Sequence, residues 1–585
     1  MAISEKILKA PPSTSFAEDP RDYFGTVLWT GNSASDASGT TQSINGGKFD
    51  AAADFTANNS KINFYNPISQ ASDTDCTFSI WMYFKTAPGT SGFLYSLIGR
   101  DVSANYAPIQ INLYGNSSGG PSLSFERYAN GTQRYSTNSG TVGQFNFSTG
   151  TWYHVAFVYT ASSTSVQVYV NGSTSGSSYT LDYSASRTTS NSTSSLGVYD
   201  GQAYPTSYTF DGYLDQMRIY DSALSSSDVS ALANETYADS YKVNFPTGKT
   251  AKVLMRLNGN ANDETGASNG TASNITWKYG VNFNPDLIWL KKRSDNTSAD
   301  HMMFDTSRGP ATNLNFVYPN GSWAESSGGA TYLIDTNTGG FQVGGSTYVN
   351  KSSETYVAWC WKVNGGTTAS DSTGDITSTV QVNDDAGISI VLYTTNGSNS
   401  ARVGHGLAKT PKAVLIKKRS ATGSWHFMTT AIDGSFDDLI LDSTGTKSDS
   451  SLTAPTSTTF AAESGTTSVT MVAYCIHDVD GYQKIGSYTG NGSTNGPLVE
   501  TGFKVGWIMI KRSDGGADPW AIFDNQRNQT NPRSCTLRAN VNDAENCGTD
   551  KINFYDDGFQ PITNWSGFNA SGGTYLYWAI AAPPE

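Results

Sequence analysis

The stretch Asn284–Ser294, NPDLIWLKKRS, decides the fold, because close copies of it return twice further along the chain. The copies read TPKAVLIKKRS at Thr410–Ser420 and VGWIMIKRS at Val505–Ser513. In each copy an apolar run of strand length is followed at once by cations and a serine. This pattern predicts a buried strand that leaves a core, and it predicts that strand three times.

The flanking segments keep the same register. FDTSR (Phe304–Arg308) and FDNQR (Phe523–Arg527) stand at the same offset from the serine of their copies. An aromatic strand then closes each unit: ETYVAWCWK (Glu354–Lys362), VTMVAYCIH (Val469–His477) and GTYLYWAIA (Gly573–Ala581). We therefore predict three repeats, at 252–366, 386–481 and 482–585, each long enough to bury its own β-sandwich core.

Composition points to the same fold class. The chain has 585 residues, too many for a single hydrophobic core. Charged residues make up only 15%, aromatic residues 12%, and glycine is abundant, a balance typical of strands and turns. We expect an all-β, multidomain protein.

Charge and hydropathy exclude some partners. The net charge of -13 argues against nucleic acid, because binding phosphates needs a clustered excess of cations. The sequence has no apolar run long enough for a membrane span. The first residues, MAISEKILKAPPSTSF, lack the apolar stretch of a secretion signal, so we expect no signal-dependent export.

Residues 1–23 hold adjacent prolines and no periodicity, which is typical of an arm. From residue 24 to 236 the pattern is that of a β-sandwich. Thr77–Phe84 alternates like a half-buried strand, and Thr151–Gly172 holds two strands and ends in an Asn-Gly turn signal. A connector at 237–251 and a Gly/Ser/Thr-rich linker at 367–385 separate the predicted domains.

The first domain resembles the laminin G-like, concanavalin A-like jelly roll. The segments that carry the resemblance are VLWTGNSASDASGT (Val27–Thr40), FSIWMYFK (Phe78–Lys85), the strand pair within Thr151–Gly172, and Phe210–Leu232. The resemblance implies two packed antiparallel sheets with a short helix near 228–232. The predicted fold is therefore an N-terminal jelly roll followed by three tandem β-sandwich-like repeats.

A fold of this kind does not by itself supply a function. The resemblance implies glycan binding in many members, often with calcium, and polysaccharide hydrolysis in some. Hydrolases of the family carry ExDxxE, which supplies two neighbouring carboxylates, and that motif is absent here. Glu126 has no carboxylate partner at the required spacing, so we expect no enzyme.

Two binding sites stay open as hypotheses. Calcium needs oxygen ligands from loops, and it is the one cofactor that the pattern leaves open, with candidate ligands Asp101, Asp200, Asp211 and Asp215. These aspartates could equally cap turns. Sugar rings stack on exposed aromatics, and the candidates in polar, Gly-rich segments are Tyr106, Tyr128, Tyr135 and Tyr204. Their alternative role is packing in the core.

Other chemistry-bearing residues favour structural roles. Asp305 with Arg308, and Asp524 with Arg527, predict ion pairs that fix a turn. The five histidines are scattered, and none has the sequence context of a triad or a metal site. We expect Cys360 and Cys475, which occupy corresponding closing strands, to be small buried apolar side chains. Whether Cys535 and Cys547 pair stays open at this point.

The repeats resemble a domain type found in structural proteins of tailed bacteriophages, on the strength of PDLIWLKKRS, FDTSRG and ETYVAWCWK. The resemblance implies a virion component at the particle surface or tail, anchored to other virion proteins by the arm, with a host-surface glycan as partner. Trimerisation is a further expectation by analogy. The alternatives are a capsid- or tail-decorating protein without glycan affinity, and a secreted lectin.

Overall fold

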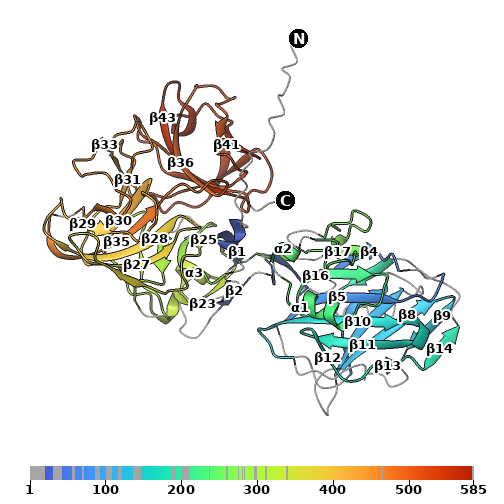
Figure 1. The fold of residues 1–585 in the computed structure, drawn as a ribbon. Coiled ribbons are helices and arrows are strands. Elements are labelled where there is room, and N and C mark those ends of the chain that lie inside the picture. The colour runs from blue at the N-terminus through green and yellow to red at the C-terminus, as the bar shows by residue number, and fades with distance from the viewer. Residues whose placement is uncertain are drawn as a thin grey trace, which may run out of the picture. The chain divides into compact units, whose positions relative to one another are not determined.

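The computed structural model of the protein describes residues 20–582 with gaps. The gaps are 31–41, 46, 50, 56–59, 69–70, 86–91, 101–107, 116–121, 136–146, 187–192, 199–209, 236, 241, 258–260, 274–275, 280, 282, 295–298, 310–311, 338–339 and 464. The described chain is all-β, as predicted, and it divides into two compact units (Figure 1). We call residues 46–279 the jelly-roll unit, and residues 20–45 with 280–582 the three-repeat unit.

The jelly-roll unit consists of two antiparallel sheets. The first has the order β12 (Ser173–Thr174), β11 (Ser165–Val170), β10 (Trp152–Thr160), β5 (Cys76–Phe84), β16 (Gly212–Tyr220), β3 (Ala51–Asp54), β19 (Thr276–Tyr279), with β13 (Tyr179–Thr180) on β11 and β17 (Val253–Met255) on β16. The second has the order β14 (Tyr183–Ser186), β9 (Thr132–Tyr135), β8 (Ser122–Ala129), β7 (Ile109–Gly115), β6 (Gly92–Arg100), β15 (Thr193–Leu196), β4 (Lys61–Tyr65), β18 (Thr271–Ser273).

Alternate residues of the two sheets meet in one core, which includes Phe78, Ile111, Phe125 and Phe157. The predicted helix is α1 (Ser226–Ala233), and it packs on the outer face of the first sheet. Ser225 and Asp228 form a capping box at its start, which satisfies amide groups that the helix leaves free. The other helices are single turns: α2 (Tyr237–Ser240), α3 (Thr347–Asn350), α4 (Ser566–Asn569), η1 (Pro20–Asp22), η2 (Ala161–Ser163) and η3 (Gly329–Thr331). Among the described residues no helix is both long and apolar enough to cross a membrane.

The three repeats share one strand order: opening strand, closing strand, then three strands that follow one another along the chain. In repeat 1 these are β1 (Phe24–Thr30), β25 (Thr355–Trp361), β20 (Leu287–Lys292), β21 (Met302–Asp305) and β22 (Phe316–Val317). In repeat 2 they are β28 (Ile388–Asn396), β35 (Thr467–Ile476), β30 (Ala413–Lys418), β31 (His426–Thr429) and β32 (Asp437–Ile440). In repeat 3 they are β36 (Gln483–Thr489), β43 (Thr574–Ala581), β38 (Val505–Arg512), β39 (Ala521–Asp524) and β40 (Arg533–Arg538).

Smaller strands complete each repeat. Repeat 1 adds the sheet β2 (Gln42–Asn45), β24 (Gly340–Val343), β23 (Leu333–Asn337). Repeat 2 adds β26 (Ala369–Asp371), β27 (Ser378–Asn383) and β33 (Ser448–Asp449) to its main sheet, and β29 (Arg402–Gly404) with β34 (Thr459–Ala461). Repeat 3 adds β41 (Asn546–Tyr555), β42 (Gly558–Pro561) and β37 (Val499–Glu500).

The apolar runs that mark the repeats have both faces buried, which explains why they do not alternate with polar residues. In β20, Ile288 and Leu290 face a core of repeat 1 alone. Their neighbours Leu287 and Trp289 face a second core that all three repeats share. Repeats 1 and 2 each bury a core of their own, as predicted, and one side of their central strands also belongs to the core that all three repeats share, which was not predicted.

The shared core is rich in tryptophan. Trp507 of repeat 3 lies with its ring centroid 6.2 Å from that of Trp359 and 6.0 Å from that of Trp361, both of repeat 1. Phe427 of repeat 2 lies 5.3 Å from Trp520 of repeat 3. These contacts pack the three repeats together in one compact unit.

The opening strand of repeat 1 is separated from the rest of its repeat by the whole jelly-roll unit. Strand β1 pairs with β25 over its full length, from Phe24 opposite Trp361 to Thr30 opposite Thr355. The predicted jelly-roll start at residue 24 is therefore wrong. The signal was present: VLWTGN at 27–32 matches the openings VLYTTN at 391–396 and GSYTGN at 486–491 better than any jelly-roll strand.

The predicted end of the jelly roll also moves. Residues 253–255, 271–273 and 276–279 pair with jelly-roll strands, so the connector at 237–251 and the predicted start of repeat 1 at 252 lie inside the jelly-roll unit. The predicted linker 367–385 contains β26 and β27, which extend the sheet of repeat 2. Alternation in ITSTVQVN (376–383) was the overlooked sign of a strand.

The repeats are joined head to tail by three equivalent hairpin tips, at 318–325, 440–447 and 538–545. Each tip reaches the next repeat, and the third tip returns to repeat 1, so the arrangement closes on itself. A ring nitrogen of the next repeat contacts the first carbonyl of each tip: Trp425 Nε1 with Tyr318, Trp520 Nε1 with Ile440, and His301 Nε2 with Arg538. The last amide of each tip donates to a carbonyl of the next repeat: Glu325 to Arg419, Lys447 to Ser513, and Glu545 to Arg293.

Candidate functional site

The outer face of the second jelly-roll sheet is polar, although the strands that form it are buried on their other side. In β7, Ile109, Ile111 and Leu113 point into the core, so Gln110 and Asn112 point to the opposite face. Cross-strand pairing extends this row. Glu126 lies opposite Gln110, and Ser124 lies opposite Asn112. The result is a continuous band of amide, hydroxyl and carboxylate groups.

Polar residues recur on this face on either side, in β9 and, beyond β6, in β15 and β4. On one side Gln133 lies opposite Tyr128, and Tyr135 lies opposite Glu126. On the other side Ser195 lies opposite Asn63, whose strand ends at Tyr65. We call the following residues the polar sheet face: Asn63, Tyr65, Gln110, Asn112, Ser124, Glu126, Tyr128, Gln133, Tyr135 and Ser195.

Some groups of the polar sheet face bond to one another, and some have no partner. Gln133 Nε2 donates to Glu126 Oε2 at 2.6 Å, and Ser195 Oγ donates to Asn63 Oδ1 at 2.7 Å. Asn112 Oδ1 and Ser124 Oγ are buried and form no hydrogen bond. Asn112 is only 1% exposed. Because an unpartnered buried polar atom costs free energy, these two atoms mark a polar spot that the fold leaves unsatisfied, and both are closed to solvent in this structure.

Tyr65 is the exposed aromatic of the polar sheet face. Its neighbours Ile62 and Phe64 lie in the core, and Tyr65 itself is 55% exposed. An exposed ring beside amide groups is the arrangement that stacks on a sugar ring while the amides bond to its hydroxyls. Tyr65 was not among the residues predicted from the sequence. Alternation in KINFY at 61–65, with Ile62 and Phe64 inward, was the signal that could have found it.

The predicted glycan-binding tyrosines divide into two pairs. Tyr128 and Tyr135 do lie on the polar sheet face, but in strands β8 and β9 rather than in the predicted loops. Tyr128 is only 2% exposed, so its ring is not a stacking platform, and Tyr135 is half-buried at the end of its strand. Tyr106 and Tyr204 lie outside the described residues.

Of the predicted calcium ligands, the structure describes Asp211 and Asp215, and it does not bring these two together. Asp101 and Asp200 lie outside the described residues. Asp211 and Asp215 stand four positions apart along one chain segment, about 13 Å in extended backbone, which is too far to share an ion. Asp215 is fully buried and accepts a hydrogen bond from the Phe49 amide at 3.0 Å. Burial raises its pKa well above the usual range, and Arg256 is the nearby charge, so Asp215 is a poor calcium ligand.

A buried polar cluster lies on the outer face of the first jelly-roll sheet. His154 Nε2 and Ser79 Oγ are 2.8 Å apart, and Arg218 forms an ion pair with Glu235, which also accepts from Trp81 Nε1 at 3.0 Å. Burial lowers the pKa of His154 to about 3, assisted by the charge of Arg218. His154 is therefore neutral at physiological pH and holds strands together, as its place in a strand predicted.

The predicted ion pairs of the repeats are confirmed. Arg308 Nε lies 2.5 Å from Asp305 Oδ2, and Arg527 Nε lies 2.5 Å from Asp524 Oδ2, and all four side chains are buried. Each aspartate also accepts a hydrogen bond from the closing strand of another repeat, Asp305 from Tyr474 Oη at 2.7 Å and Asp524 from Trp359 Nε1 at 3.0 Å. The pairs therefore join repeats, which the sequence did not predict.

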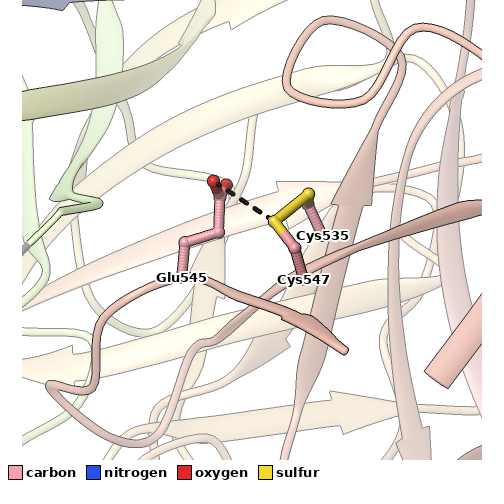
Figure 2. Close-up of side chains that lie close together, drawn as sticks. All are labelled: Cys535, Glu545 and Cys547. Carbon is pink, nitrogen blue, oxygen red and sulfur yellow. Dashed lines mark hydrogen bonds between the residues drawn. A yellow bond between two sulfur atoms is a disulfide. The ribbon is translucent and has the colours of Figure 1, made fainter. Parts of the chain in front are cut away.

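The cysteines take two forms. Cys360 and Cys475 are free and buried at matching positions of the closing strands, as predicted, and Cys76 is free and buried in the jelly-roll unit. Cys535 and Cys547 form a disulfide (Figure 2). Glu545 Oε2 lies 3.9 Å from Cys547 Sγ. In the disulfide form these sulfurs are not available as metal ligands.

The two sheets, the polar sheet face and the helix α1 define a lectin-like jelly roll, and residues 55–230 match the concanavalin A-like lectin/glucanases superfamily. Residues 261–584, more than half of the chain, match the family described as a domain of unknown function, DUF7483, and the chain belongs to that family. The family match covers the three repeats apart from β1 and β2, and its first residues fall in the jelly-roll unit. No curated protein matches the chain.

Solved structures match the chain at low similarity. A Bacteroides ovatus protein described as carbohydrate-binding is 17% identical, with 40% of this chain and 60% of that one covered and a TM-score of 0.28. A heptameric SAP-like pentraxin from Limulus polyphemus is 16% identical, with 40% and 96% covered and a TM-score of 0.27. The CBM40 domain of a Ruminococcus gnavus sialidase, bound to sialyllactose, is 15% identical, with 34% and 99% covered and a TM-score of 0.23. The chain thus spans less than two thirds of the first of these proteins, and at these scores none of the three carries a functional argument.

Proposed function

We propose that the protein is a non-enzymatic structural protein whose jelly-roll unit binds a neutral glycan on the polar sheet face. The observation that carries the proposal is the exposed ring of Tyr65 on a sheet face of amides and hydroxyls, which also holds the buried, unpartnered atoms Asn112 Oδ1 and Ser124 Oγ. The match to a lectin and glucanase superfamily supports it. The superfamily alone would not distinguish binding from hydrolysis.

The chemistry of the polar sheet face favours binding over hydrolysis. Retaining hydrolysis needs two carboxylates about 5 Å apart, and inverting hydrolysis needs two at a larger separation. Glu126 is the one carboxylate of the polar sheet face as defined above, and its neighbours across the strands are Gln110 and Tyr135. Amides and hydroxyls recognise uncharged sugar hydroxyls, so a neutral glycan fits better than a sialylated or sulfated one.

A binding experiment with the full-length protein tests the proposal. Against a panel of neutral glycans, Tyr65→Ala is expected to raise the Kd roughly tenfold, because a lost stacking contact costs on the order of 1.4 kcal/mol. Ser124→Ala is expected to act in the same direction. Tyr555→Ala is the matched control, because Tyr555 is 37% exposed but lies in repeat 3. Equal affinities for all four proteins would contradict the proposal.

We propose further that the protein works at the surface or tail of a tailed-phage particle, with the part of the predicted arm before residue 20 as its attachment to other virion proteins. Residues 20–23 of the predicted arm belong to the three-repeat unit, where Tyr23 is buried in the shared core. The support is the resemblance of the repeats to phage structural domains, together with a three-repeat unit that is rigidly closed on itself. The three similar repeats form near-threefold contacts within a single chain. This arrangement therefore does not require a homotrimer. On such a particle, the polar sheet face binds glycan on the host surface.

Two alternatives differ in where the protein is found and what it binds. A decorating protein of the capsid or tail would be detected on particles by immunogold labelling but would bind no glycan. A secreted lectin would bind glycan but be absent from particles. Immunogold labelling of purified particles, combined with the glycan panel, separates the three functions.

A further inference from the structure

The disulfide lies at the base of the third hairpin tip. Strands β40 and β41 pair with Cys535 opposite Cys547, and the tip 538–545 lies between them. The equivalent pair in repeat 2 is Asp437 opposite Asp449. The equivalent positions in repeat 1, one step outside the bridge between Phe316 and Ser326, are Asn315 and Ser327. The three tips share their fold, but only the third has a covalent base.

The tip that the disulfide closes carries polar contacts of repeat 3 with repeat 1, in addition to those of the shared core. Glu545 receives Arg293 of repeat 1, with Nη2 at 2.7 Å from Oε2, and also Arg527 of its own repeat, with Nη1 at 2.9 Å from Oε1. Lys291 Nζ of repeat 1 donates to the Asn542 carbonyl at 3.2 Å. Because Glu545 stands two residues before Cys547, the disulfide fixes the segment that presents this carboxylate (Figure 2).

This junction differs from the other two in its covalent connection. Repeat 1 continues directly into repeat 2, and repeat 2 into repeat 3, so the chain itself keeps those neighbours together. Repeat 3 ends the described chain and meets repeat 1 without such a link. At the junction between repeats 2 and 3 the base is held ionically, because Lys447 Nζ contacts Asp437 at 2.5 Å and Asp449 at 3.2 Å. The base of the tip is thus held by ion pairs in repeat 2 and by a disulfide in repeat 3.

The disulfide is open to small reductants. Cys547 is exposed and Cys535 is half-buried, whereas the three free cysteines are buried. Reduction by a dithiol breaks the Sγ–Sγ bond, and each sulfur gains a proton and an electron. The dithiol loses the same two electrons and two protons and closes to its own cyclic disulfide. No other atom of the protein changes in this exchange.

We propose that Cys535–Cys547 is a redox-responsive latch on the junction that closes the three-repeat unit. With the disulfide formed, the third tip holds Glu545 between Arg527 and Arg293, and the junction stays closed. With the thiols free, the base of the tip gains conformational freedom, and repeats 3 and 1 separate more often at this edge. The latch makes closure strongest in an oxidising environment outside a cell.

Hydrogen exchange of the full-length protein, followed by mass spectrometry, tests the latch. In the presence of dithiothreitol, amides of 538–546 are expected to exchange at least roughly tenfold faster than in its absence, as the loop constraint is lost. The double variant Cys535→Ser with Cys547→Ser is expected to exchange fast with or without the reductant. The tips 318–325 and 440–447 are internal controls, and their exchange is expected to stay unchanged.

Two results would overturn the latch. The first is an exchange rate at 538–546 that neither dithiothreitol nor the double variant alters. The second is equal acceleration of all three tips, which would mean that reduction destabilises the whole unit rather than one junction. Reduced wild-type protein supplies the comparison if the double variant folds poorly, because its thiols form after folding.

Discussion

Replacing Arg308 with methionine is expected to lower the unfolding free energy of the three-repeat unit by about 3–5 kcal/mol. Arg308 is fully buried and contacts Asp305 at 2.5 Å and Glu325 at 2.8 Å. Without the guanidinium, the Asp305 carboxylate stays buried beside the Tyr474 hydroxyl with no compensating charge. Removing only one partner of a buried ion pair is costly, because the desolvation of the remaining charge is no longer offset.

The measurement is urea-induced unfolding of the full-length protein, followed by tryptophan fluorescence. Lys351→Met is the matched control, because it removes an exposed lysine of the same repeat, paired with Glu354 at 3.2 Å. An exposed pair of this kind contributes less than about 1 kcal/mol. Similar losses for the two variants would contradict the account, since they would mean that the buried pair is not what joins repeats 1 and 2.

Lowering the pH is expected to destabilise the jelly-roll unit through His154. Burial lowers its pKa to about 3 from the ordinary value of about 6.5, so between these pH values the unfolded chain binds a proton that the folded chain does not. The contribution of neutral His154 to the unfolding free energy is fully present above about pH 6.5. It is then lost by about 1.4 kcal/mol per pH unit as the pH falls to about 3, or about 5 kcal/mol in all.

The experiment compares wild type with His154→Gln, which does not titrate, over pH 3–8. Asp215 and Glu235 have raised pKa values from burial, so they stabilise the fold more at low pH and act against His154. Subtracting one protein from the other cancels these carboxyl groups. We expect the stability of wild type relative to the variant to fall as the pH drops below about 6.5. A difference that stays constant with pH would contradict the account, because it would show that folding leaves the pKa of His154 unchanged.

The sequence predicted the features that depend on local pattern. Three spaced copies of an apolar run with cations, such as Leu287–Lys292, indicate repeated buried strands because period and length are local properties. The ion pair of Asp305 with Arg308 was also predictable, since its partners stand one turn apart. What failed was the domain boundary. Strand β1 pairs with β25 across more than three hundred residues, and the shared core depends on contacts between repeats that no local pattern contains.

The candidate site was predicted only in part, for a related reason. Tyr128 and Tyr135 were chosen as loop residues, but they reach the polar sheet face because strands β8 and β9 place them there. Asn112 and Ser124 gained importance only from their position opposite each other and from their missing partners. Pairing register and hydrogen-bond satisfaction are properties of the folded sheet, so the sequence could name the domain but not its binding surface.

The most direct test of the account is the glycan affinity of the two units taken apart. The excision is feasible because Ala51 lies opposite Tyr279, so the two ends of the jelly-roll unit leave it side by side. The proteins to compare are the full chain, residues 46–279 alone, and the chain with 46–279 replaced by a short Gly/Ser linker. We expect residues 46–279 alone to match the Kd of the full chain within about twofold, and we expect the linker protein to fold but not to bind. Binding that stays with the three-repeat unit would contradict it.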